Sequence, residues 1–147
     1  MTDPLNINLI IPFKDNKDNK DTRLQLYRNE IERYKTQLCD RVTELQGDLE
    51  SLFGQKFELT LAPRSDGNAR KYYWRFKSSK RDRKYNRLNA ETVVEYVKNF
   101  EPTRKRRLIE IEEELIYINA NLKLIKGIID AIEQSIAEKE VLINLVF

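Results

Sequence analysis

Two long stretches of the chain carry apolar residues at a helical spacing. In residues 23–53, leucine or isoleucine recurs every seven positions from Leu24 to Leu45. In residues 103–145, apolar residues follow a regular three–four spacing as far as Ile136. Such patterns predict helices that bury one stripe against another helix. We therefore expect two long helices that pair with each other, within the chain or across a dimer.

Between these helices, apolar and polar residues alternate with the period of a β-strand. One alternating run covers residues 56–62 and a second covers residues 69–78, with an Asp-Gly turn signal between them. The second run places on one face the aromatic residues Tyr72, Trp74 and Phe76. We predict a β-hairpin over residues 56–78. A lone two-stranded hairpin is marginally stable in water, so its apolar face should dock on the helices or on the short helix that follows.

The remaining segments complete a single predicted domain over residues 1–147. Residues 1–22 indicate an extended N-terminal segment, with the apolar run Leu5–Phe13, and a polar link. Residues 79–100 indicate a basic loop and a short helix. The predicted fold is mainly α: an antiparallel, coiled-coil-like hairpin of long helices, with a small β-hairpin and the short helix inserted between them, at its tip. The 147 residues include only four Gly and four Pro, and such a low content of these helix-breaking residues is typical of long helices.

The composition disfavours several kinds of chemistry. The chain has no His, and Cys39 is its only cysteine, so histidine-based catalysis and an internal disulfide are excluded and a structural zinc site is disfavoured. No nucleotide-binding or hydrolase motif is present. We expect a protein that is not an enzyme, with no cofactor and no bound metal. No apolar run approaches the roughly 20 residues of a membrane span, and the N-terminus lacks a basic signal-peptide region, so we expect a cytoplasmic protein.

Basic charge is concentrated in the middle of the chain. Residues 64–87 contain ten basic and two acidic residues, although the net charge of the chain is only +3. Lys and Arg attract phosphates, exposed aromatic rings can stack on bases, and a β-ribbon can enter the major groove of DNA. The predicted nucleic-acid-binding residues are Arg70, Lys71, Tyr73, Arg75, Lys77, Lys80, Arg81, Arg83, Lys84, Arg87, Arg104, Lys105, Arg106 and Arg107.

The four cations at 104–107 begin the last helix. In a helical hairpin they lie at the same end as the β-hairpin, so we expect the two basic clusters to join into one surface. The alternative for these four residues is a solvated helical turn with pairs such as Arg106 with Glu110.

Part of the basic stretch resembles a known kind of protein. The residues Tyr72, Tyr73, Arg75, Lys77, Lys84 and Tyr85 match the pattern Tyr-Tyr-x-Arg-x-Lys…Lys-Tyr. This is similar to short aromatic–basic hairpins, followed by helices, in small uncharacterised proteins of plasmids, phages and other mobile elements. The glycines that usually shape the second turn are replaced here by Ser78 and Ser79. The resemblance covers about 20 residues and implies the handling of DNA.

These patterns favour a non-enzymatic nucleic-acid-binding protein, an accessory or regulatory factor that binds DNA in preference to RNA through a basic, aromatic tip. Two alternatives remain open. One is a coiled-coil interaction module, such as a scaffold or a prefoldin-like holdase, whose basic tip meets an acidic protein. The other is an inhibitor of a nucleic-acid enzyme. A homodimer through the helix stripes is a further prediction, and no membrane partner is expected.

Overall fold

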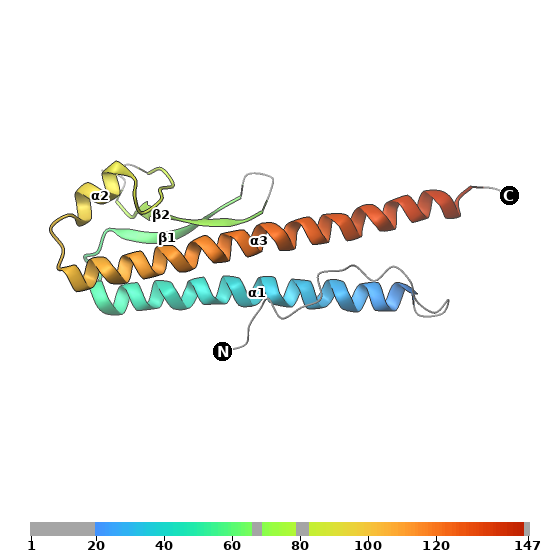
Figure 1. The fold of residues 1–147 in the computed structure, drawn as a ribbon, viewed down its shortest axis with the longest axis horizontal. Coiled ribbons are helices and arrows are strands. Elements are labelled where there is room, and N and C mark those ends of the chain that lie inside the picture. The colour runs from blue at the N-terminus through green and yellow to red at the C-terminus, as the bar shows by residue number, and fades with distance from the viewer. Residues whose placement is uncertain (1–19, 66–68, 79–82, 146–147) are drawn as a thin grey trace.

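The computed structural model describes residues 20–65, 69–78 and 83–145. Figure 1 shows two long antiparallel helices with a β-hairpin lying along them. The elements in chain order are helix α1 (Lys20–Phe53), strands β1 (Leu59–Arg64) and β2 (Lys71–Phe76), helix α2 (Glu91–Val97) and helix α3 (Pro102–Ile143). The structure confirms the predicted mainly helical fold. Helix α1 begins three residues before the predicted Arg23, so residues 20–22 of the predicted extended segment and link are helical. The rest of that segment, residues 1–19, lies outside the described residues.

The two long helices pair through the apolar stripes that the sequence predicts. In α1 the buried stripe includes Ile31 and Leu45, and in α3 it includes Ile111 and Leu115. Gly54 directly follows the last residue of helix α1; its φ of +77° suits glycine, and its N–H donates to the Glu50 carbonyl at 3.0 Å. The predicted helix stripes are therefore used within one chain, where they form the core of the helix pair.

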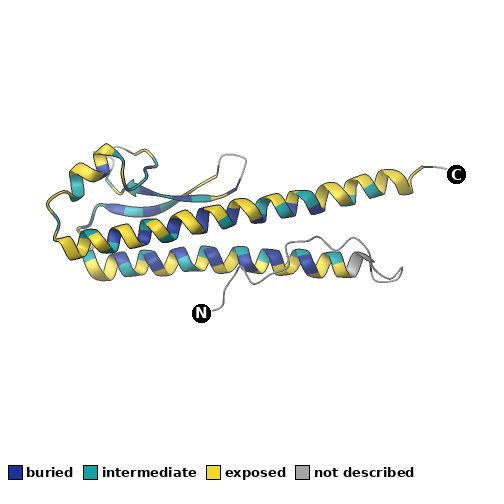
Figure 2. Ribbon diagram, viewed as in Figure 1, coloured by how far each residue is buried: buried dark blue, intermediate teal, exposed yellow. Residues whose placement is uncertain are grey.

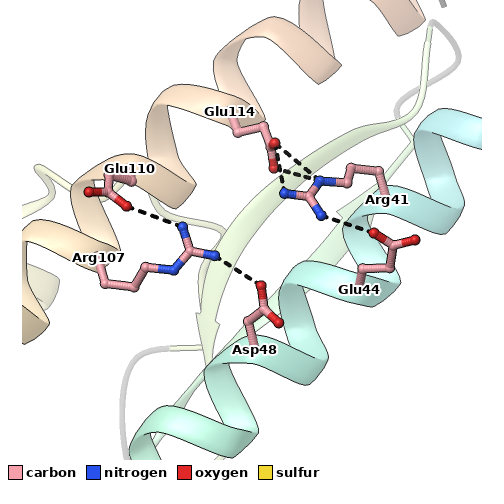
Figure 3. Close-up of polar contacts among 6 residues, drawn as sticks. All are labelled: Arg41, Glu44, Asp48, Arg107, Glu110 and Glu114. Carbon is pink, nitrogen blue, oxygen red and sulfur yellow. Dashed lines mark hydrogen bonds and ion pairs between the residues drawn. The ribbon is translucent and has the colours of Figure 1, made fainter. Parts of the chain in front are cut away.

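Ion pairs connect the two long helices at several points along their length. Arg41 is the centre of one group, because its Nε lies 3.0 and 3.1 Å from the two Glu114 oxygens and its Nη1 lies 2.9 Å from Glu44 (Figure 3). Arg107 of α3 contacts Asp48 of α1 at 2.9 Å and Glu110 at 3.3 Å (Figure 3). Nearer the other end, Arg28 pairs with Glu133 at 2.6 Å. Residues early in α1 therefore contact residues late in α3, as an antiparallel pair requires.

The β-hairpin folds back over the helices and does not extend beyond their end, which corrects its predicted position at the tip (Figure 1). Strand β1 contacts α1, and strand β2 contacts α3. The physical reason is the apolar face of the hairpin, where Trp74 is 0% exposed and Leu59 and Phe76 are also buried. These side chains are removed from water only if the hairpin lies flat on the helix pair. Figure 2 shows buried positions on the strands and on both long helices.

Partners outside the hairpin bind the backbone groups at its edges. On β2, the Tyr72 N–H donates to Asn119 Oδ1 at 2.8 Å, and Asn119 Nδ2 donates to the Tyr72 carbonyl at 3.0 Å. Trp74 exchanges two 2.8 Å backbone hydrogen bonds with Asn86. On β1, the Leu61 N–H donates to Gln46 Oε1 at 2.9 Å. Side chains from both long helices and the backbone of one loop segment therefore satisfy buried or partly buried polar groups at both edges.

Aromatic rings fill the end of the molecule where α1 leads into β1. The Phe53 and Phe57 rings stack with centroids 4.3 Å apart. Tyr96 of α2 packs edge-on against Phe76 at 5.6 Å and accepts a hydrogen bond from the Glu58 N–H at 3.0 Å. Helix α2 is therefore tied to the hairpin by both ring packing and a polar contact.

We predict that Asn119→Ala destabilises the protein by about 2–4 kcal/mol, because it leaves the N–H and carbonyl of Tyr72 buried without partners. Urea unfolding followed by circular dichroism measures the free energy of unfolding. Asn121→Ala is the matched control, since the Asn121 side chain donates a hydrogen bond within its own helix, to the Tyr117 carbonyl. It should cost less than about 0.5 kcal/mol. Equal losses for the two variants would contradict the role given to Asn119.

We also predict a measurable coupling between Arg41 and Glu114. A double-mutant cycle with Arg41→Ala and Glu114→Ala should give about 0.5–1 kcal/mol at low salt, because both side chains are one-third exposed and the contact is bidentate. The coupling should fall in 1 M salt, where charges are screened within roughly 3 Å. Additive effects of the two substitutions would show that the ion pair adds nothing to stability.

Candidate nucleic-acid interface

The two faces of strand β2 differ in chemistry. The side chains of Tyr72, Trp74 and Phe76 are buried, as the alternation predicts. The intervening side chains of Lys71, Tyr73 and Arg75 are only partly buried, and Lys77, just after the strand, is exposed. We call this second side the outward face of the hairpin.

A short segment beside β2 widens this face. Residues 83–87 lie against the free edge of the strand, and Asn86 pairs with Trp74 in an antiparallel bridge. Because neighbouring residues in an extended segment point to opposite sides, the buried Asn86 leaves Tyr85 on the outward side. The Tyr85 ring lies edge-on to the Tyr73 ring, with centroids 6.2 Å apart.

Arginines surround the two tyrosines on the outward face. The guanidinium carbons of Arg75 and Arg64 lie 4.8 and 5.6 Å from the centre of the Tyr85 ring. The guanidinium carbon of Arg87 lies 5.8 Å from the centre of the Tyr73 ring. These distances suit cation–π contacts. We call the set Arg64, Tyr73, Arg75, Tyr85 and Arg87 the arginine–tyrosine cluster.

Hydrogen bonds hold two arginines of this region in place. Arg75 Nε donates to the Arg83 carbonyl at 2.8 Å, and Arg83 Nη1 donates to the Lys77 carbonyl at 2.9 Å. Arg83 and Lys84 themselves are exposed. The backbone carbonyls thus orient guanidinium groups without neutralising their charge.

Arg87 connects the cluster to the helix pair. Its Nη2 lies 2.9 Å from Glu112 Oε1 of α3, and the other Glu112 oxygen accepts a hydrogen bond from the Leu88 N–H. One carboxylate therefore partly neutralises Arg87 and fixes the end of the crossing segment on α3.

Arg70 lies near the other end of β2. Its guanidinium group and the Cys39 thiol both lie close enough to the Tyr72 hydroxyl to shift the pKa of that phenol. Burial raises the pKa of the Tyr72 phenol, the contact with Cys39 adds to this, and Arg70 opposes it. Arg70 also lines a cavity of about 220 Å³ together with Lys35 of α1 and Lys126 of α3. This cavity lies between the hairpin and the long helices, and Lys126 there is paired with Asp130 at 2.8 Å.

The four cations of the second basic cluster point in different directions, and Lys105 lines one groove together with Arg87. Successive residues of an α-helix point about 100° apart, so four in a row face four directions. Arg104 lies over the Phe53 ring at 5.7 Å, Arg107 pairs with Asp48, and Lys105 lines a groove beside α2. Arg106 is exposed on a further side. The structure also pairs Glu110 with Arg107, where the sequence suggested Arg106.

The structure brings together most of the predicted residues of the hairpin, and it adds others. Lys80 and Arg81 lie outside the described residues. Arg64 and Tyr85 were absent from the predicted site. The hairpin register could have found Arg64, because it stands opposite Lys71. Tyr85 belongs to the Tyr-Tyr…Lys-Tyr resemblance, but only the bridge beside β2 shows which way it faces.

Two further findings concern other kinds of site. Within residues 20–65, 69–78 and 83–145, no group of three or more His, Cys, Asp or Glu side chains is placed to hold a metal ion. In the same ranges, no helix combines the length and the apolar character needed to cross a membrane.

Comparison with known proteins adds no identity. The chain matches no protein-family model, no curated protein and no solved structure.

Proposed function

We propose that this protein is a non-enzymatic nucleic-acid-binding protein that binds DNA in preference to RNA through the outward face of the hairpin. The observation that carries this proposal is a concentration of positive charge around two tyrosines on one side of the hairpin and its neighbouring segment. The described cations there are Arg64, Lys71, Arg75, Lys77, Arg83, Lys84 and Arg87.

Pre-ordering of the arginines supports binding to phosphates. A flexible arginine loses rotamer freedom when it binds, which weakens the complex. Arg75 is already held by the Tyr85 ring and by the Arg83 carbonyl, so little freedom remains to be lost. Its planar guanidinium group suits the paired oxygens of a phosphate. Each phosphate contact also releases counterions, which favours binding at low salt.

The shape of the element supports DNA over RNA. Two strands with a third short segment form a narrow ribbon, and β-ribbons fit the major groove of B-form DNA. The major groove of double-stranded RNA is too deep and narrow for side chains to read. Tyr73 and Tyr85 give the ribbon an aromatic centre that can contact sugars or unpaired bases.

We assign the protein an accessory or regulatory role, since binding without a chemical step is all that the outward face supports. The main rival is an acidic protein that docks on the same cations. Nucleic acid is favoured over this partner because arginines held beside aromatic rings suit both phosphates and bases.

We predict that Lys71→Ala combined with Lys77→Ala weakens binding to duplex DNA by roughly tenfold or more. The slope of log K against log salt should fall by about two, one for each lost phosphate contact. Fluorescence anisotropy of labelled duplex DNA, from low to physiological salt, measures both quantities. The control is Arg33→Ala combined with Lys123→Ala, which removes the same charge from exposed positions on α1 and α3. If wild type shows no binding at low salt, or if the two variants lose affinity equally, the proposed interface is wrong.

We predict that Tyr85→Ala weakens DNA binding several-fold, because Arg64 and Arg75 lose the ring beside which they lie. Tyr85→Phe keeps the ring and should retain affinity within about twofold. The same anisotropy titration compares them, and circular dichroism confirms that both variants are folded. A loss in Tyr85→Phe as large as that in Tyr85→Ala would show that the hydroxyl, and not the ring, matters.

A further inference from the structure

Helix α3 has a second apolar side in addition to the one that packs on α1 and the hairpin. Ile109, Ile116 and Leu124 are 52%, 48% and 56% exposed, and Leu142 continues the same side toward the end of the helix. At 100° per residue these positions fall within about a quarter of the helix circumference. We call this side the outer face of α3. The exposed Ala120 and Gly127 lie on it between the large apolar residues, and so do the exposed Glu113, Gln134 and Glu138.

The outer face continues into an apolar groove beside α2. This groove has a volume of about 530 Å³, and both Ile109 and Ile116 line it. Its other apolar walls come from α2, through Val94 and Val97, and from Leu88. An exposed apolar surface that runs along a helix and into a groove is typical of a protein interaction site.

The charges at the two ends of α3 indicate how a partner would lie. Arg106 near the start of α3 and Glu138 near its end are both exposed, and at 100° per residue both lie on the outer face. A second copy packed antiparallel brings the basic end of each α3 to the acidic end of the other. A parallel copy instead brings like charges together, which costs free energy.

We propose that a second copy of this chain packs antiparallel on the outer face of α3 and forms a two-fold symmetric dimer. The helix has 42 residues, so it is ~63 Å long. A contact strip ~10 Å wide along it covers roughly 600 Å² per copy, near the lower range of specific interfaces. A Cβ added at Gly127 meets no atom within 4 Å, so the centre of this face is open to the close approach of a second helix. This dimer does not depend on nucleic-acid binding.

Sedimentation equilibrium of the full chain up to about 100 µM tests the dimer. We expect a dimer that weakens with salt, and Ile116→Glu combined with Leu124→Glu should raise its Kd by roughly tenfold or more. The matched control is Leu26→Glu combined with Leu52→Glu on α1, at positions that are 63% and 49% exposed, and it should dimerise like wild type. Circular dichroism confirms that each variant is folded. A monomeric wild type overturns the proposal and leaves Leu5–Phe13 as the candidate cover of this face. A dimer that Ile116→Glu and Leu124→Glu leave unchanged also overturns it.

A cross-linking experiment tests the antiparallel order. In a Cys39→Ala background, one chain carries Arg106→Cys and another carries Glu138→Cys, and a short bifunctional maleimide is added to the mixture. The antiparallel dimer predicts cross-links between the two different chains. Cross-links only between chains carrying the same substitution would indicate a parallel pair and overturn the proposed arrangement.

Discussion

The amide of Asn119 holds the β-hairpin against the helix pair, and much of the molecule depends on this contact. A two-stranded sheet has two free edges, and backbone groups that leave water there need partners. Asn119 supplies both a donor and an acceptor to Tyr72, while Gln46 of α1 supplies an acceptor to Leu61. With its edges satisfied, the hairpin can lie flat and bury Trp74 completely. An isolated hairpin of this size has neither partners for its edges nor a surface on which to bury its apolar face.

This anchoring also decides which surface the hairpin presents to solvent. Once Tyr72, Trp74 and Phe76 face the helices, the alternation of a strand directs Lys71, Tyr73 and Arg75 outward. The segment around Tyr85 then lies beside β2 because Asn86 pairs with Trp74. The arginine–tyrosine cluster is therefore a consequence of the same docking that buries the apolar face. Core and proposed interface are two sides of one small sheet, so core substitutions under the hairpin should also disturb the cluster.

One side of helix α3 packs in the core, and the opposite side is exposed. Its inner stripe packs on α1 and β2. Glu112 forms an ion pair with Arg87, and Glu114 forms one with Arg41. In the proposed dimer the outer face is used as well, and each α3 lies between its own chain and the partner. Such a dimer carries two basic hairpin faces. Two linked sites bind one long DNA more tightly than either site alone, provided that both reach it. The two proposals are independent, but together they describe a bivalent DNA-binding protein.

The periodicity of the sequence was enough to predict two paired long helices, the hairpin, and the burial of Tyr72, Trp74 and Phe76. These features depend on local spacing, because apolar residues that repeat with the period of a helix or strand must share a face. Only the tertiary structure placed the hairpin along the helices, gave Asn119 its partners, and brought Arg64 and Tyr85 to one cluster. It also separated Arg104–Arg107 into different directions. Those outcomes depend on which faces meet and on backbone groups at strand edges, and a pattern of side chains along the chain does not contain that information.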